Sequence, residues 1–228
     1  MKINIARFRW IHGLLFFIII CTGCAGPNLY SINMYYDAEK AVIPNDLQTS
    51  VKSPGTDISV SEFTDNRQMD NQLMIGRVLQ SDGSRSFVFP KSVKATKSVS
   101  NGIKNYLKKA GHKVTERLEQ WNTKESDIPK GDSRLLIGGN IEELEINCRK
   151  GFFSNSYTGN IKLNIFFADT VKGKILYSGQ VASHYYKETS LFSENMLEEE
   201  ADIILGDAIE KFFEDKVVSQ KFKEALGK

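Results

Sequence analysis

Histidine and cysteine are scarce: the 228 residues include only three of each. Beyond the N-terminal segment remain His112, His184 and Cys148, and none has a second ligand at a spacing typical of zinc sites. A lone cysteine also excludes an intramolecular disulfide there, even in an oxidising compartment. We therefore expect no metal, no cofactor, and a Cys148 that is buried as a small apolar side chain.

The chain also lacks a large excess of basic or acidic residues. The chain has 30 basic and 28 acidic residues, for a net charge of +2. Removing an N-terminal segment that carries Lys2, Arg7 and Arg9 leaves 27 basic against 28 acidic residues. Proteins that bind nucleic acids have a clear basic surplus, so we expect no nucleic-acid partner.

Only one long hydrophobic run is present, Ile11–Ile20, and it is interrupted by His12 and Gly13. Its length of about ten residues is half of the roughly twenty that span a bilayer. Basic residues precede the run, and the small residues Thr22 and Gly23 follow it. This order is typical of a secretory signal peptide.

Cys24 changes the kind of signal that is predicted. Acylation of an exported protein requires a thiol at the first mature position, behind small residues, and Cys21–Cys24 resembles such a lipobox with Cys21 in place of the usual Leu. We predict a signal peptide over residues 1–23 and a lipid on Cys24 that holds the chain on a membrane. A plain signal peptide with a chance cysteine is the alternative. Ala25, where an Asp is the inner-membrane retention signal, favours the periplasmic side of the outer membrane.

The mature chain divides at about residue 56. Residues 24–56 contain scattered Pro, Asn and Ser and are predicted to be a lipidated tether and lead-in, with a short extended piece at 30–36 that adds an edge strand. Residues 57–228 are long enough for one sizeable core. They are predicted to form a single α+β domain.

Periodicity gives the elements of that domain. Apolar residues recur at helical spacing over 92–110 and 193–215, and alternate with polar residues in three long segments at 135–148, 157–168 and 175–187. Shorter strands are expected at 58–63, 73–79 and 87–89. The predicted fold is an antiparallel sheet of about five strands with two long helices packed on one face.

One short motif suggests catalysis. Gly131–Leu135 resembles the nucleophile block of GDSL-type esterases, with Ser133 as the nucleophile. An extra Arg interrupts the block, and His184, the one later histidine, lacks an Asp shortly before it. A polar turn that leads into a strand explains the motif better, and we expect no enzyme activity.

Phe152, Phe153 and Tyr157 flank a polar loop between two predicted strands. Two adjacent Phe side chains in a loop are difficult to bury together. We therefore predict that these three aromatic residues contact a partner protein or lipid; the alternative is that they pack beneath the sheet.

The order of these features resembles the YajG-like family of uncharacterised outer-membrane lipoproteins. The resemblance rests on Cys24, on the block Val60–Arg67 followed by Ile75–Gly76, and on the closing order of helix, three strands and helix. It implies an α+β lipoprotein without known catalytic residues. The expected function is that of a lipid-anchored, non-catalytic binding or scaffold protein with a possible envelope partner. The alternatives are an auxiliary lipoprotein of an envelope lipid-transport system and an ester hydrolase of the envelope.

Overall fold

A computed structural model describes residues 29–49, 57–131 and 133–227 of the chain. The predicted signal peptide and the predicted acylation site Cys24 lie outside these residues. No helix in the described ranges is long and apolar enough to cross a membrane.

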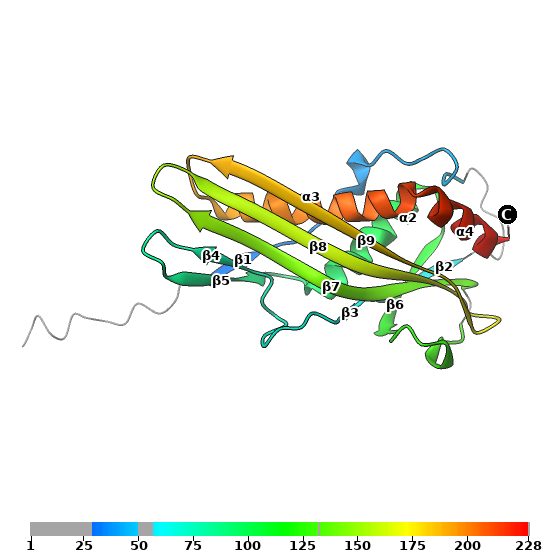
Figure 1. Ribbon diagram of the computed structural model, residues 1–228. Helices are drawn as coiled ribbons and strands as arrows, with labels where there is room; N and C mark the ends of the chain where they lie inside the picture. Colours follow the sequence, from blue (N-terminus) through cyan, green and yellow to red (C-terminus); the bar gives the residue numbers. More distant parts are fainter. Residues whose placement is uncertain (1–28, 50–56, 132, 228) are drawn as a thin grey trace, which may run out of the picture.

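The described residues form one sheet of nine strands (Figure 1). Its strands are β1 Leu29–Ile32, β2 Ile58–Glu62, β3 Thr64–Asp65, β4 Gly76–Leu79, β5 Arg85–Pro90, β6 Val114–Gln120, β7 Leu135–Lys150, β8 Asn155–Asp169 and β9 Lys174–Thr189. The helices are α2 Ala95–Lys109, α3 Glu194–Glu214 and α4 Lys216–Leu226, with short 3-10 turns η1 Ala38–Lys40 and η2 Glu125–Asp127.

Strand β7 organises the sheet. One edge pairs antiparallel with β8 over its whole length, and β8 pairs antiparallel with β9. The other edge of β7 pairs in succession with β2, β3 and β4, all parallel to it. Strand β6 extends the sheet beyond β2 in parallel, and β5 and β1 extend it beyond β4.

The predicted antiparallel sheet of about five strands with two helices is therefore wrong. The sheet is mixed, has nine strands within the described residues, and is accompanied by three α-helices. Strands of two to five residues such as β2, β3 and β4 are too short to show their pairing partners in the sequence. Strand β6 was not predicted, because it lies at the sheet margin beside β2 and its described side chains are mostly exposed, without an alternating apolar pattern.

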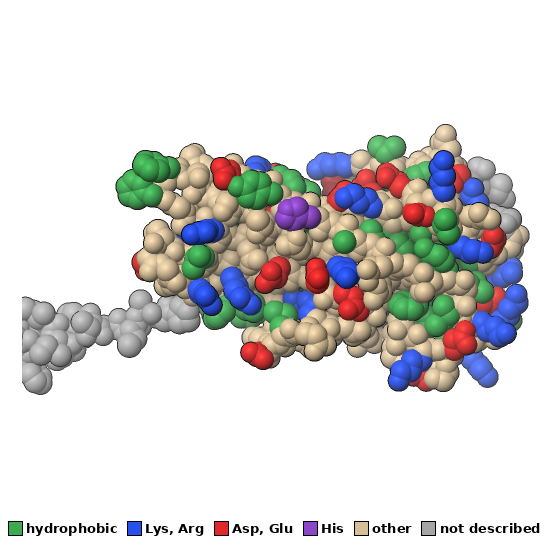
Figure 2. Space-filling model, viewed as in Figure 1, with side chains coloured by type: hydrophobic (Ala, Val, Ile, Leu, Met, Phe, Trp, Pro, Cys, Tyr) green, Lys and Arg blue, Asp and Glu red, His purple; other side chains and the backbone are tan. Residues whose placement is uncertain are grey.

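The three long strands and both long helices were predicted correctly as elements. Alternate residues of β8, from Tyr157 to Phe167, face α3 and are buried, while the residues between them are partly exposed. The opposite face of the sheet is largely open, and Figure 2 shows interspersed acidic and basic side chains with one histidine on it. There the β9 residue His184 bonds through Nδ1 to the Asn160 side-chain oxygen at 2.6 Å.

The C-terminal helix α4 is a separate element rather than a frayed end of α3. Asp215 ends α3 in an extended conformation, and its carboxylate accepts N–H groups of Val217 and Val218 at 2.7 and 3.1 Å. These bonds cap a new helix. Phe222 on α4 packs edge-on against Phe213 of α3, so the second helix closes the end of the core.

Much of the segment assigned to the tether belongs to the folded domain. Strand β1 pairs parallel with β5 at the sheet edge, as the extended piece at 30–36 predicted. Alternate side chains Tyr30, Ile32, Met34 and Tyr36 are buried in the main core, and Leu47 follows them. The described residues 29–49 therefore form a strap over the domain.

A charged side chain is buried beside β7. The Arg67 guanidinium is almost fully buried and forms a bidentate ion pair with Asp65, at 2.9 and 2.7 Å. Its remaining N–H groups donate to the backbone oxygens of Gln72, Met74 and Leu144. One side chain thus ties the loop after β3 to the middle of the longest ladder.

Candidate functional site

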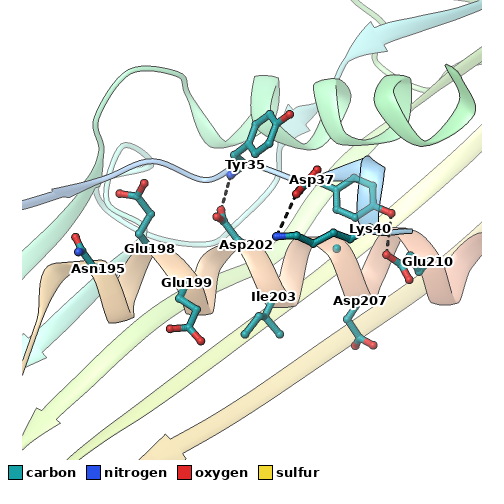
Figure 3. A pocket seen from close by; sticks show the side chains of 12 residues that line it. Tyr35, Asp37, Lys40, Asn195, Glu198, Glu199, Asp202, Ile203, Asp207 and Glu210 are labelled. Carbon is teal, nitrogen blue, oxygen red and sulfur yellow. Dashed lines mark hydrogen bonds and ion pairs between the residues drawn. The ribbon is translucent and has the colours of Figure 1, made fainter. Parts of the chain in front are cut away.

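A groove of about 780 Å³ lies between α3 and the strap (Figure 3). The strap contributes residues 35–37 and Lys40, and α3 contributes a row of acidic side chains. Because three turns of α3 line the groove, the spacing of these acids follows the helical period. They are Glu198, Glu199, Asp202, Asp207 and Glu210.

The acids of α3 hold the strap in place. Glu198 accepts the backbone N–H of Asn33 at 3.2 Å, and Asp202 accepts that of Tyr35 at 2.6 Å. The Tyr36 hydroxyl donates to Glu210 at 2.8 Å. Burial raises the pKa of Asp202 to about 6, and the nearby Glu198 adds to the rise. The acidic row is therefore a clamp for backbone groups that have no strand partner.

The other acids of the groove are paired with basic or hydroxyl groups. Glu199 forms an ion pair with Lys187 of β9 at 3.1 Å, and Asp207 forms one with Lys211 at 2.6 Å. Ser183 also donates to Asp207 at 2.5 Å. In the described ranges no cluster of three or more His, Cys, Asp or Glu side chains is arranged to hold a metal ion.

Glu200 points the other way, into the core between α3 and the sheet. It is 1% exposed, and neither carboxylate oxygen has a hydrogen-bond partner. The facing residue of β8 is Gly159, where an added Cβ would lie 2.9 Å from Cγ of Glu200. Burial raises the pKa of Glu200 to about 8, so the carboxyl group is mostly protonated near neutral pH.

Cys148 and Tyr157 lie on the same side of the sheet as Glu200. Cys148 is a free, buried thiol, as predicted, and burial raises its pKa to about 11. The Tyr157 hydroxyl accepts the backbone N–H of Ser193, the N-cap of α3, at 3.0 Å. A thiol in this state is a poor nucleophile, so the cluster has a packing role.

The structure separates the three aromatic residues of the predicted contact patch. Phe152 and Phe153 are 90% and 87% exposed at the β7–β8 loop, with their ring centroids 4.8 Å apart and edge to face. Tyr157 is 1% exposed and does not belong to this surface. It shares the inward face of β8 with Ile161 and Phe167, and this period of two was already visible in the sequence.

The structure does not bring Ser133 and His184 together as the esterase alternative requires. Ser133 is buried, and its hydroxyl donates to the Ser59 hydroxyl at 2.7 Å. Ser133 lies just before Leu135, the residue of β7 that pairs with Asp169 at the end of β8. His184 pairs with Asn160, nine residues away along β8, which corresponds to roughly 30 Å. The two side chains are too far apart for a nucleophile and its base.

Sequence reasoning missed the clamp and the buried acid. A signal for the clamp was present, because Glu198 and Asp202 are four residues apart and lie on one side of α3. Glu200 ends a run of three acids, Glu198–Glu200, which is typical of a solvated start of a helix. Its neighbours Leu197, Ala201 and Ile204 belong to the buried stripe, and Glu200 falls within the same arc of the helix.

No family model matches the sequence, and no curated protein matches it. The structure is similar to that of XCC0632 from Xanthomonas campestris, of the family DUF330, with a TM-score of 0.50 and 10% identity. That match covers 86% of this chain and 99% of the other. Because the identity is so low, the likeness shows a shared fold alone.

Two further solved structures are less similar. The C-terminal domain of LpoB from Salmonella enterica has a TM-score of 0.30 at 10% identity, over 60% of this chain and 87% of that one. The lipoprotein GNA1162 from Neisseria meningitidis has a TM-score of 0.25 at 12% identity, over 67% and 96%. The solved structures similar to this chain thus include a DUF330 protein and a bacterial lipoprotein, and the YajG-like family is not named among these three.

Proposed function

We propose that the chain is a lipid-anchored, non-catalytic binding or scaffold protein of the cell envelope. It faces the periplasm from the outer membrane. The observation that carries this proposal is the position of Cys24, only five residues before β1 of the folded unit. Two or three acyl chains on that cysteine give near-permanent anchoring and place the domain directly at the membrane.

The fold supports a binding role rather than turnover. The acids of the groove are engaged by the strap and by Lys187 and Lys211, and Ser133 is buried just before the start of β7. We also propose membership of the YajG-like family. In support, its block at 60–67 forms β2, β3 and the buried Arg67 network, a structural rather than catalytic feature.

Processing at Cys24 is the first test. We expect the mature protein to begin at Cys24 and to carry added acyl mass, because the thiol is the acceptor. Cys24→Ala should leave the outer-membrane fraction, whereas Cys21→Ala, with the acceptor intact, should stay there. Intact-mass analysis and membrane fractionation measure both. A Cys24→Ala protein that remains membrane-bound contradicts the proposal.

Hydrolysis is the second test. We expect no ester hydrolysis above background on envelope lipids or acylated cell-wall fragments, since Ser133 is buried and His184 lies roughly 30 Å away along the sheet. Two variants serve as matched controls for this test. Ser133→Ala removes the hydroxyl, whereas Ser59→Ala breaks the same hydrogen bond but keeps Ser133. Activity that survives Ser59→Ala and disappears with Ser133→Ala would establish the esterase instead.

A further inference from the structure

Three connections lie together at one end of the molecule, opposite the C-terminus (Figure 1). They are the β4–β5 turn, the β7–β8 loop and the β9–α3 connection, because β4, β7 and β9 all run toward this end. We call it the aromatic end, after Phe152 and Phe153. Leu191 of the β9–α3 connection is exposed there too. Figure 2 shows hydrophobic side chains that stand clear of the surface at this end.

Strand β1 enters the sheet from the aromatic end. It runs parallel to β5, which is antiparallel to β4, and β4 is parallel to β7. Strand β1 is therefore antiparallel to β7 and begins where β7 finishes. Leu29 pairs with Phe87, Phe87 with Arg77, and Arg77 with Asn147, so the start of β1 is level with a residue only three before the end of β7.

The chain before β1 is short. Four residues lie between Cys24 and Leu29, and the five residue steps from one to the other span at most about 18 Å when fully extended. Three strand spacings, roughly 14 Å, separate β1 from β7 in the plane of the sheet. An acylated Cys24 thus holds the domain close to the bilayer, and the phenylalanine loop is on the side from which the anchor arrives.

Basic side chains flank the same end. Arg77, Arg85 and Arg149 line a hollow of about 490 Å³ on the open face of the sheet, together with Glu145. Asp82 is the acidic residue of the neighbouring β4–β5 turn. Arg149 precedes Phe152 by three residues, or about 10 Å of extended chain. That offset matches the distance between lipid phosphates and the upper acyl chains, into which interfacial side chains insert by about 5–10 Å.

We propose that Phe152 and Phe153 insert into the bilayer that holds the Cys24 acyl chains, with the three arginines at the level of the lipid phosphates. This inference rests on the proposed lipid anchor. The domain then touches the membrane at two points, the lipid on Cys24 and the loop of Phe152 and Phe153, and these fix its orientation. The clamp groove and the open sheet face remain turned toward the periplasm. The rings are exposed in the folded domain and gain an apolar environment only at the membrane.

Depth-dependent quenching tests the insertion. The acylated full-length mature chain is reconstituted on vesicles of phosphatidylethanolamine and phosphatidylglycerol that contain lipid brominated near the top of its acyl chains. Phe153→Trp provides the probe, and Val171→Trp, 79% exposed in the β8–β9 turn at the other end of the sheet, is the matched control. Trp121 is buried in both and provides a common background that the wild type measures.

We expect the brominated lipid to quench most of the emission that Phe153→Trp adds and none of the emission that Val171→Trp adds. Vesicle-bound protein in which the brominated lipid leaves the emission of both probes equally unquenched overturns the inference alone. Wild-type protein that does not float with the vesicles overturns the lipid anchor as well. The double variant Phe152→Ser/Phe153→Ser should keep the wild-type melting temperature, because neither ring is packed; a large drop would mean that the rings belong to the core.

Discussion

Replacing Arg67 with Met is expected to lower the free energy of unfolding by about 3–5 kcal/mol. The variant keeps most of the side-chain volume but removes the positive charge beside Asp65 and the donors to three backbone oxygens. Those groups are enclosed by the loop after β3 and by β7, where water does not replace the lost bonds. Chemical denaturation followed by circular dichroism measures the change.

The matched control for Arg67 is an exposed ion pair. Lys221→Met breaks the pair between Lys221 and Glu224 on α4, whose side chains are both partly exposed. Surface pairs of this type contribute less than about 1 kcal/mol. If Arg67→Met were as mild as Lys221→Met, the guanidinium network would not be a structural element of the loop.

Replacing Glu200 with Gln is expected to remove a pH dependence from the stability of the protein. The unfolded chain releases the Glu200 proton near the ordinary pKa of 4.5, whereas the folded protein keeps it up to about 8. The contribution of the protonated carboxyl is therefore complete below the lower value and is lost as the pH rises through the higher one. Between these values the wild type loses roughly 1.4 kcal/mol per pH unit through this group.

Denaturation of wild type and Glu200→Gln at about pH 5 and about pH 8 measures this effect. From the lower to the higher pH, the free energy of unfolding of the variant should rise by roughly 4 kcal/mol relative to that of the wild type. Glu199→Gln is the matched control, because the adjacent carboxylate is half-exposed and paired with Lys187. If the stability of Glu200→Gln changed with pH as much as that of the wild type, the carboxyl group would have to find water or a partner when it ionises.

The elements that the sequence predicted are those whose signal is local. Over β8, apolar residues alternate for more than ten positions, and the α3 stripe from Leu197 to Phe212 repeats at the helical period. Strands β2 and β4 were also expected, at 58–63 and 73–79, whereas the two residues of β3 were not; none of the three is long enough to show which strand it pairs with. Their parallel pairing with β7 joins positions about 70 or more residues apart, which no local pattern encodes.

The candidate functional residues also divide into those that a local pattern predicts and those that depend on contacts between distant segments. The exposure of Phe152 and Phe153 follows from two adjacent rings in a short loop, and the sequence was sufficient to predict it. The burial of Tyr157 could also be predicted. It is an even number of positions from Ile161 and Phe167 along β8, so the three side chains lie on the same face of the strand. The placement of Glu198 and Asp202 on one side of α3 could be predicted from their spacing, but their bonds to the strap could not, because these depend on where a segment 165 residues earlier crosses α3.

The strap also determines the order in which the domain can be completed. Its bonds to Glu198 and Asp202 join residues 165 and 167 positions apart, so they form only after nearly the whole chain has been synthesised. Contacts of such long sequence separation form late, because closing large loops is entropically costly. The strap, although synthesised before the rest of the domain, is therefore the last described segment to be fixed in place. The acylation proposed for Cys24 would thus act on a thiol that is still attached to an open chain.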